Sequence, residues 1–371
     1  MTPKERLLTV LKCGIPDRVP ISTYEMFPYH RRFEYKHPSY DPLLQALVGR
    51  SDSMVMWDPP SNETVFCSSY QVDMDVETFR NANQTITKKT LHTPKGDLTQ
   101  TTKVIDNIKT TWQTEHWCKS LEDVEKVLSI PYEPLTYNVS ECVNVRNTLK
   151  DQGIIMSSPS DPLWLTADLM EFGDYTVWAM TESNRFEKVV KIMHERNMEN
   201  LRRQLDANTV ELYRICGPEY ATPPYLPKEL FQRFVVPYVT EMVDLIHEKG
   251  GLVRFHSHGK INQVLDMICS TGADGIDPCE GPPDGDIPLE DVKKRCKGKM
   301  CVFGNIQLKL LENGSPEDVD QAIRTCMDQA KEGGGFVIMP TASPINIPLS
   351  DKTYGNYMQF IESALKYGMY E

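Results

Sequence analysis

Residues 251–277 read GLVRFHSHGKINQVLDMICSTGADGID, and this stretch indicates the fold. It opens with a short apolar run at 251–256, which is typical of a buried strand. A helical segment follows at 261–270, and a second apolar run at 273–277 predicts the next strand. A strand, a helix and another strand in this order predict the βαβ unit of a parallel sheet.

The same alternation continues along the chain in both directions. Six strands, each followed by a helical segment, are expected at 153–157, 210–215, 251–256, 273–277, 300–304 and 335–339. Two earlier apolar runs, at 19–22 and 53–57, bring the sum to eight. Eight such strands predict closure into a (β/α)8 TIM barrel, with an open doubly wound sheet as the alternative. No GxGxxG follows the first strand, so a dinucleotide site lacks support.

Residues 62–117 have a different residue pattern, because β-forming residues there alternate with polar ones. Short antiparallel strands are expected at 85–87, 91–93 and 99–104, with a turn at 94–97. We interpret the chain 1–371 as one barrel domain in which 62–117 is an inserted β-meander. The insertion is either a plain structural element or a lid, a cofactor platform or an oligomer contact.

Composition excludes several classes of protein. The chain has 371 residues, with 40 Lys and Arg against 52 Asp and Glu, so its net charge is −12. This charge disfavours nonspecific binding to nucleic acid or to an anionic membrane, since both need a basic face. No apolar run approaches the roughly 20 residues of a membrane-spanning helix. The ten cysteines form no CxxC pair, which favours reduced thiols and a cytoplasmic location.

Polar residues follow several of the expected strands, where a TIM barrel carries its active site. These residues are Glu219, His256, His258, Glu280 and Asn305. Along an extended chain His256 and His258 point the same way. Imidazole and carboxylate ligands suit Zn²⁺ acting as a Lewis acid, whereas without a metal both His would bond to backbone carbonyls. Glu280 is a metal ligand, a general acid, or a carboxylate that orients His258.

Other polar residues at strand ends are weaker candidates. Asp58 and Glu25 each end an early strand, and Asp58 is also typical of a turn-forming residue. Ser157, Ser158 and Ser160 follow another strand, where hydroxyls usually satisfy backbone groups.

Several short motifs resemble the uroporphyrinogen decarboxylase superfamily. They are TPKER at 2–6, PDRVP at 16–20, HSHG at 256–259, GNI at 304–306 and YG at 367–368. The resemblance runs over essentially the whole chain with the motifs in the right order, and it implies a (β/α)8 barrel.

One kind of member decarboxylates the acetate arms of uroporphyrinogen without a cofactor. Its Arg-rich N-terminal segment, of the type MRQAGR, is absent here, where residues 24–32 read YEMFPYHRR. Only Arg31 and Arg32 stand where they could partly replace its carboxylate clamps. This departure argues against the decarboxylase.

The other kind is the cobalamin-dependent methyltransferases. Those acting on coenzyme M hold zinc through a His-x-Cys pair and a later Cys. Here His256 and His258 resemble the pair, and Thr341 stands near the place of the later Cys. The departure leaves a harder ligand set, His258, His256, Glu219 and Glu280, which favours polarising an oxygen over activating a thiol.

The resemblance therefore implies a corrinoid-dependent methyltransferase that takes a methyl group from a methylated or methoxylated small molecule with the help of zinc. We expect Glu280, His256 and Asn305 to be catalytic. The corrinoid would arrive on a separate carrier protein, because the chain has no DxHxxG motif. A homodimer is a further implied state. The alternatives are a cofactor-independent decarboxylase of a porphyrinogen or another carboxylate, and a noncatalytic tetrapyrrole-binding protein.

Overall fold

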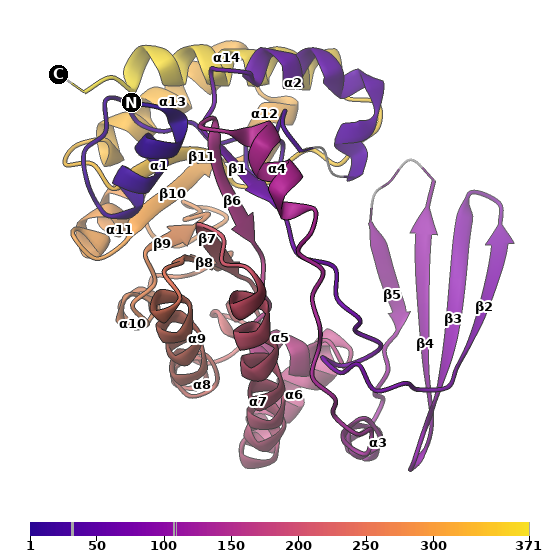
Figure 1. Ribbon diagram of the computed structural model, residues 1–371. Coiled ribbons are helices and arrows are strands. Elements are labelled where there is room, and N and C mark those ends of the chain that lie inside the picture. The colour runs from indigo at the N-terminus through magenta and orange to yellow at the C-terminus, as the bar shows by residue number, and fades with distance from the viewer. Residues whose placement is uncertain (31–32, 107, 109, 371) are drawn as a thin grey trace. The chain divides into compact units, whose positions relative to one another are not determined.

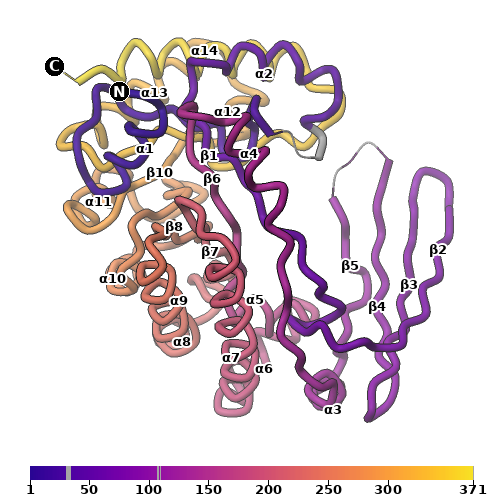
Figure 2. The backbone as a smooth tube through the Cα atoms, viewed as in Figure 1, coloured from indigo at the N-terminus to yellow at the C-terminus, as the bar shows by residue number. Residues whose placement is uncertain are grey.

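The computed structural model describes residues 1–30, 33–106, 108 and 110–370, and its chain forms two compact units (Figures 1 and 2). The first unit comprises Met1–Asp58, Ser140–Pro159 and Thr209–Glu371. The second unit comprises Pro59–Val139 and Ser160–Asn208. Each unit contains a sheet of its own, parallel in the first and antiparallel in the second.

The first unit contains a curled parallel sheet whose strands follow one another in chain order. Within the described residues its strands are β1 (Ser53–Met56), β6 (Gly153–Ser157), β7 (Leu212–Ile215), β8 (Leu252–His256), β9 (Gly275–Asp277), β10 (Cys301–Ile306) and β11 (Phe336–Pro340). Each lies within two residues of a strand expected from the sequence. The parallel (β/α) architecture is therefore confirmed.

The segment around Ile21 supplies the eighth position of the barrel. Ile21 forms a parallel bridge to Ile338 of β11. On this side the Ser22 N–H donates to the Ile338 carbonyl at 3.0 Å. On the other side the Asp52 N–H, just before β1, donates to the Ile21 carbonyl at 2.7 Å. The last strand and the first are thus joined through Ile21, and the sheet closes.

Helices alternate with these strands in the first unit. They are α1 (Pro3–Leu11), η1 (Phe33–Lys36), η2 (Pro38–Tyr40), α2 (Asp41–Leu47), α4 (Cys142–Leu149), η3 (Pro218–Ala221), α8 (Lys228–Phe234), α9 (Val236–Glu248), α10 (Leu265–Ser270), α11 (Leu289–Cys296), α12 (Leu308–Asn313), α13 (Pro316–Ala330) and α14 (Asp351–Tyr367). The sequence signals for their ends operate as expected. Thr2 and Glu5 form a capping box at α1, and Ser315 and Asp318 form another at α13.

The second unit carries the antiparallel sheet β2 (Met74–Asn81), β3 (Gln84–Thr93), β4 (Gly96–Ile105) and β5 (Thr111–Glu115), in that order (Figure 1). The inserted β-meander is therefore confirmed. The strands expected at 85–87 and 91–93 are one strand, because Lys88, Lys89 and Thr90 continue the ladder with both neighbours. Backbone pairing does not require apolar side chains at those positions. The helices of this unit are α3 (Leu121–Leu128), α5 (Pro162–Ala167), α6 (Phe172–Thr181) and α7 (Ser183–Ala207).

In the described part of the chain no helix combines the length and the apolar character needed to span a bilayer. None of the ten cysteines, all of which lie in that part, is in a disulfide.

Asp52 anchors the closure of the barrel from inside the fold. Its carboxylate is fully buried and accepts hydrogen bonds from three groups. These are Arg6 Nη1, Arg18 Nη1 at 2.8 Å and the Ile21 N–H at 2.8 Å. A buried carboxylate is tolerated when it is paired and hydrogen-bonded in this way. Arg6 and Arg18 belong to the two N-terminal motifs, TPKER and PDRVP, so both motifs have a structural role in holding Ile21.

We expect Asp52→Ala to lower the free energy of unfolding by about 3–5 kcal/mol, because buried Arg18 loses its carboxylate partner and Arg6 keeps only Asp17. Asp52→Asn keeps an acceptor for the Ile21 N–H and should cost less. Urea unfolding followed by circular dichroism measures both, with the exposed Asp151→Ala as control. An Asp52→Ala variant as stable as the control would contradict this account of closure.

Candidate active site

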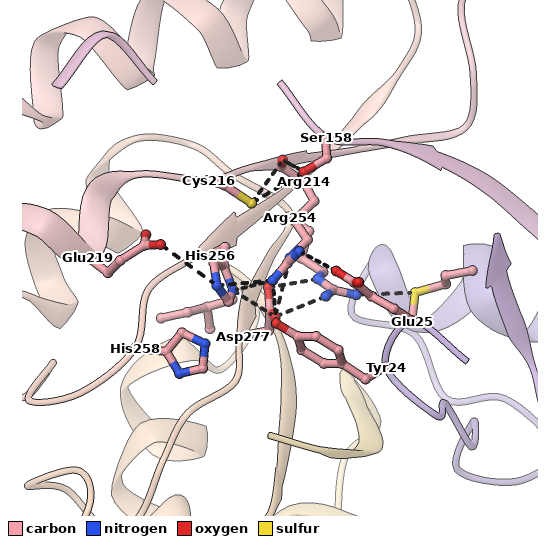
Figure 3. Close-up of polar contacts among 12 residues, drawn as sticks. Tyr24, Glu25, Ser158, Arg214, Cys216, Glu219, Arg254, His256, His258 and Asp277 are labelled. Atoms are coloured by element: carbon pink, nitrogen blue, oxygen red, sulfur yellow. Dashed lines mark hydrogen bonds and ion pairs between the residues drawn. The ribbon is translucent and has the colours of Figure 1, made fainter. Parts of the chain in front are cut away.

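Charged side chains converge at the carboxyl ends of β7, β8 and β9 (Figure 3). Strand register explains why they meet. Arg214 on β7 lies opposite Arg254 on β8, and His256 on β8 lies opposite Asp277 on β9. Tyr24, just beyond the Ile21 bridge, reaches the same cluster. The cluster therefore consists of groups from three neighbouring strands, together with Tyr24 from the segment that pairs with β11 and lies beside β1.

Asp277 is the centre of this cluster. Its carboxylate accepts a bidentate pair from Arg254, with Nε at 2.7 Å and Nη2 at 2.9 Å, and a third bond involves His256 Nδ1 at 3.0 Å. Burial by itself would raise the pKa of Asp277, but the charge of Arg254, together with His256 and Arg214, brings it well below the usual range. Asp277 is thus an ionised group that fixes the side chains around it.

Arg214 lies on the other side of His256. Its Nη1 donates to Glu25 Oε1 at 3.1 Å, its Nη2 donates to the Tyr24 hydroxyl, and its guanidinium carbon lies 5.0 Å from the centre of the Tyr24 ring. Nη2 also lies 3.0 Å from each ring nitrogen of His256. The guanidinium is therefore fully engaged by neighbouring side chains at both of its Nη atoms.

His256 is held as a neutral imidazole. Its side chain is almost wholly buried, and burial lowers its pKa, as does the charge of Arg214, while Asp277 acts in the opposite direction without outweighing them. Because ionised Asp277 can only accept, Nδ1 carries the proton and Nε2 is left as an acceptor for Arg214. Glu219 Oε1 is 4.0 Å from Nε2, which is beyond hydrogen-bond distance.

His258 and Glu280 form a second pair nearer to solvent. His258 Nδ1 lies 3.3 Å from Glu280 Oε1, and Glu280 Oε2 accepts the Gly259 N–H at 2.7 Å. The His258 ring stands edge-on to that of His256, with centres 4.7 Å apart. The His258 side chain is 39% exposed, compared with 14% for Glu280.

Each member of this pair favours the charged form of the other. Burial would lower the pKa of His258, but the hydrogen bond and the charge of Glu280 outweigh it and raise that pKa. Burial would likewise raise the pKa of Glu280, and the hydrogen bond with His258 lowers it instead. The pair can therefore hold a proton that is accessible from the barrel mouth.

The other residues expected at the site are less involved in this cluster. Asn305 Nδ2 donates to the Cys279 carbonyl at 3.0 Å, and Cys326 of α13 donates to Asn305 Oδ1 at 3.6 Å. Both partners are structural, and the catalytic role of Asn305 stays a prediction. Glu219 Oε2 accepts the Gly217 N–H at 2.9 Å, which fixes its carboxylate beside His256.

The weaker candidates have ordinary structural contacts, with the exception of Glu25. Asp58 Oδ1 accepts from the Ser157 hydroxyl at 2.8 Å and the Ser158 N–H at 2.7 Å, as a turn-forming residue does. Ser160 belongs to the second unit, where its carbonyl accepts from Asn197. Arg31 and Arg32 lie outside the described residues.

Sequence reasoning missed Arg214, Arg254, Asp277 and Tyr24. A signal for the two arginines was present: each is a single charged residue inside an otherwise apolar strand, LYRI at 212–215 and LVRFH at 252–256. A charge in a buried strand must be paired, so a matching carboxylate on a neighbouring strand could have been sought.

The expected zinc ligands do not converge in one group. In the described residues no three His, Cys, Asp or Glu side chains are placed so that they could hold a metal ion. His256 also faces the guanidinium of Arg214, which disfavours a second cation there. The four residues as placed do not fit a preassembled zinc site. The zinc expected from the sequence is therefore left to metal analysis, and no step proposed below passes through it.

A closed parallel barrel with ionisable groups at the carboxyl ends of its strands is the arrangement of TIM-barrel enzymes. The sequence profile described as uroporphyrinogen decarboxylase matches residues 106–349. The chain belongs to that family.

Among solved structures, the fold is similar over 99% of this chain and 99% of the other to a methyltransferase from Methanosarcina mazei, with 14% identity and a TM-score of 0.63. A D-psicose 3-epimerase from Clostridium cellulolyticum H10 has 9% identity over 62% of this chain and 83% of its own, with a TM-score of 0.34. The first similarity shows a shared fold, and the second carries no argument. No curated protein sequence matches the chain.

Stability should depend on pH through the His258–Glu280 pair. The raised pKa of His258 means that its contribution is present below the ordinary value of 6.5 and is lost as the pH rises through the folded value. The lowered pKa of Glu280 means that its contribution is present above 4.5 and is lost as the pH falls. The pair therefore stabilises the folded protein most between pH 4.5 and pH 6.5.

Urea unfolding of the wild type and of Glu280→Gln at pH 5.5 and pH 9 tests this dependence. The difference between the two proteins should be larger at pH 5.5, while Glu290→Gln, at an exposed acid on α11, should show no such change. An equal difference at both pH values would rule out an ionised pair.

Proposed function

We propose that this protein is a methyltransferase that moves a methyl group from a methylated or methoxylated small molecule to a corrinoid on a separate protein. The proposal rests chiefly on the proton held by His258 and Glu280 at the barrel mouth. Family membership and the fold shared with a methyltransferase support it. The alternative decarboxylase needs a free cation for a carboxylate, and both arginines of the cluster are engaged by Asp277, Glu25 and Tyr24.

The chemical problem is the leaving group. A methyl ether or a methylamine reacts slowly with nucleophiles because an alkoxide or amide leaves poorly. A proton delivered to the heteroatom as the bond breaks removes this obstacle, and such general acid catalysis typically contributes 10²–10⁴-fold. A reduced corrinoid supplies the electron pair that forms the new bond to the methyl carbon.

Each residue of the site has a separate role in this step. Protonated His258 gives its proton to the substrate heteroatom, while the electron pair of the breaking bond stays on that heteroatom. Glu280 raises the pKa of His258 and so favours its protonated form before the reaction. Asp277 and Arg214 hold His256 in one tautomer, and His256 packs edge-on against His258 and limits its ring orientation. Cys216, beside Arg214, takes no part as a thiolate, because burial raises the pKa of its thiol to about 11.

The corrinoid partner is proposed on a separate protein because this chain lacks the DxHxxG motif. Methyl transfer from candidate methoxylated and N-methylated compounds to a reduced corrinoid carrier tests the proposal directly. Transfer from at least one compound is expected. Release of CO₂ from a porphyrinogen, with no methyl transfer, would favour the decarboxylase instead.

We expect His258→Ala to lower the rate of methyl transfer by about 10²–10⁴-fold, because the general acid is removed. Glu280→Gln should lower the rate and move the alkaline limb of the pH–rate profile to lower pH. A matched control is His247→Ala, since His247 also pairs with a carboxylate, Asp274, at 2.8 Å, beside the start of β8 rather than at its carboxyl end. Full activity in His258→Ala would reject this residue as the acid.

A protein-derived acid makes a separate prediction about metal. Dialysis against a chelator should leave methyl transfer unchanged, and metal analysis measures the zinc content before and after. Loss of activity with the zinc, restored by adding zinc back, would instead support a metal as the group that activates the substrate.

A further inference from the structure

The second unit contains a cavity of about 250 Å³ that the proposed reaction does not use. All of its lining residues belong to this unit. One wall is the face of the antiparallel sheet that carries Met74, Lys89 and Gln100. The opposite wall comes from α5, α7 and the loop at 63–67. The volume is at the small end for a ligand pocket, so its occupant would be a small molecule.

The sheet wall presents two polar groups that have no side-chain partner among the described residues. Lys89 on β3 lies directly opposite Gln100 on β4, so the two side chains share one face of the sheet. Gln100 is only 7% exposed, yet within the described residues its side-chain amide forms no hydrogen bond, and Lys89 there forms no ion pair. An ammonium and an amide N–H side by side are donors suited to a carboxylate.

The helical wall carries aromatic rings and a carboxylate. Trp164 lies in α5, Asp168 caps the C-terminus of that helix four residues later, and both line the cavity. Trp117 and Phe66 add two further aromatic rings, packed edge to face with centres 6.1 Å apart. Within the described residues the Asp168 carboxylate accepts one long hydrogen bond, 3.5 Å, from Gln113 Nε2, and it also feels the charge of His116. Aromatic faces beside a carboxylate attract organic cations, quaternary ammonium groups above all.

Glu63 completes the charge pattern of the lining. Its carboxylate accepts the Cys67 N–H at 2.8 Å, which ties it to the loop that carries Phe66. The lining thus holds two carboxylates on the aromatic side and one ammonium on the sheet side. A ligand that matches both walls carries a cation at one end and an anion at the other.

We propose that this cavity binds a small N-methylated amino acid of the betaine type. Its quaternary ammonium lies among Trp117, Trp164 and Asp168, and its carboxylate lies on Lys89 and Gln100. The inference concerns the second unit alone and does not depend on the proposed methyl transfer, because binding requires neither corrinoid nor turnover.

Isothermal titration of the full chain with three probes tests the proposal. The probes are glycine betaine, choline, which lacks the carboxylate, and 3,3-dimethylbutanoate, which has the same shape as betaine but no positive charge. Betaine should bind roughly tenfold or more tightly than either of the others, since each lacks one of the two charged contacts. Undetectable binding of betaine at millimolar concentration, or equal binding of the uncharged analogue, would overturn the proposal.

Variants on the two walls test the carboxylate contact and the cation contact one at a time. Lys89→Gln should weaken betaine about tenfold and leave choline unchanged, while Asp168→Asn should weaken both cations and leave 3,3-dimethylbutanoate unchanged. Lys88→Gln is the matched control, because Lys88 is the neighbouring residue on the other face of the same strand. Circular dichroism verifies that each variant is folded. Equal effects of Lys88→Gln and Lys89→Gln would also contradict the assignment.

Discussion

The charged layer at the barrel mouth depends on one buried carboxylate, that of Asp277. It is fully buried, and it is the common partner of Arg254 and His256 on the adjacent strand. Without it, two guanidinium groups would face each other in a low-dielectric interior, where the repulsion and the desolvation of unpaired charge are both costly. Because it is ionised and only accepts, it also decides which nitrogen of His256 carries the proton.

This arrangement divides the site into a fixed part and a responsive part. The fixed part is buried: Asp277, Arg254, Arg214 and neutral His256, each held by at least two neighbours. The responsive part is the His258–Glu280 pair, where partial exposure and a single close contact let a proton enter and leave. A buried set of fixed charged residues next to a titratable pair is a physical basis for acid catalysis. The acid then keeps its position while its charge changes.

Much of this fold could be predicted from the sequence, since buried parallel strands leave continuous apolar runs such as those at 153–157 and 335–339. The polar residues after those runs could also be found, and His256, His258 and Glu280 do lie at neighbouring strand ends. The pairing of these groups could not be predicted. The sequence favours His256 as a metal ligand, whereas in the structure its nitrogens are occupied by Asp277 and Arg214.

Local sequence patterns are enough to predict the succession of strands and helices, the inserted meander and the helix caps, because apolar periodicity and capping act over a few neighbouring residues. Tertiary structure alone decided which charges meet. Arg214 and Arg254 are far apart in the chain, and only the register of β7 on β8 places them side by side. The closure through Ile21 was likewise decided in three dimensions, because its hydrogen bonds to Ile338 and Asp52 join segments whose contact no local pattern specifies.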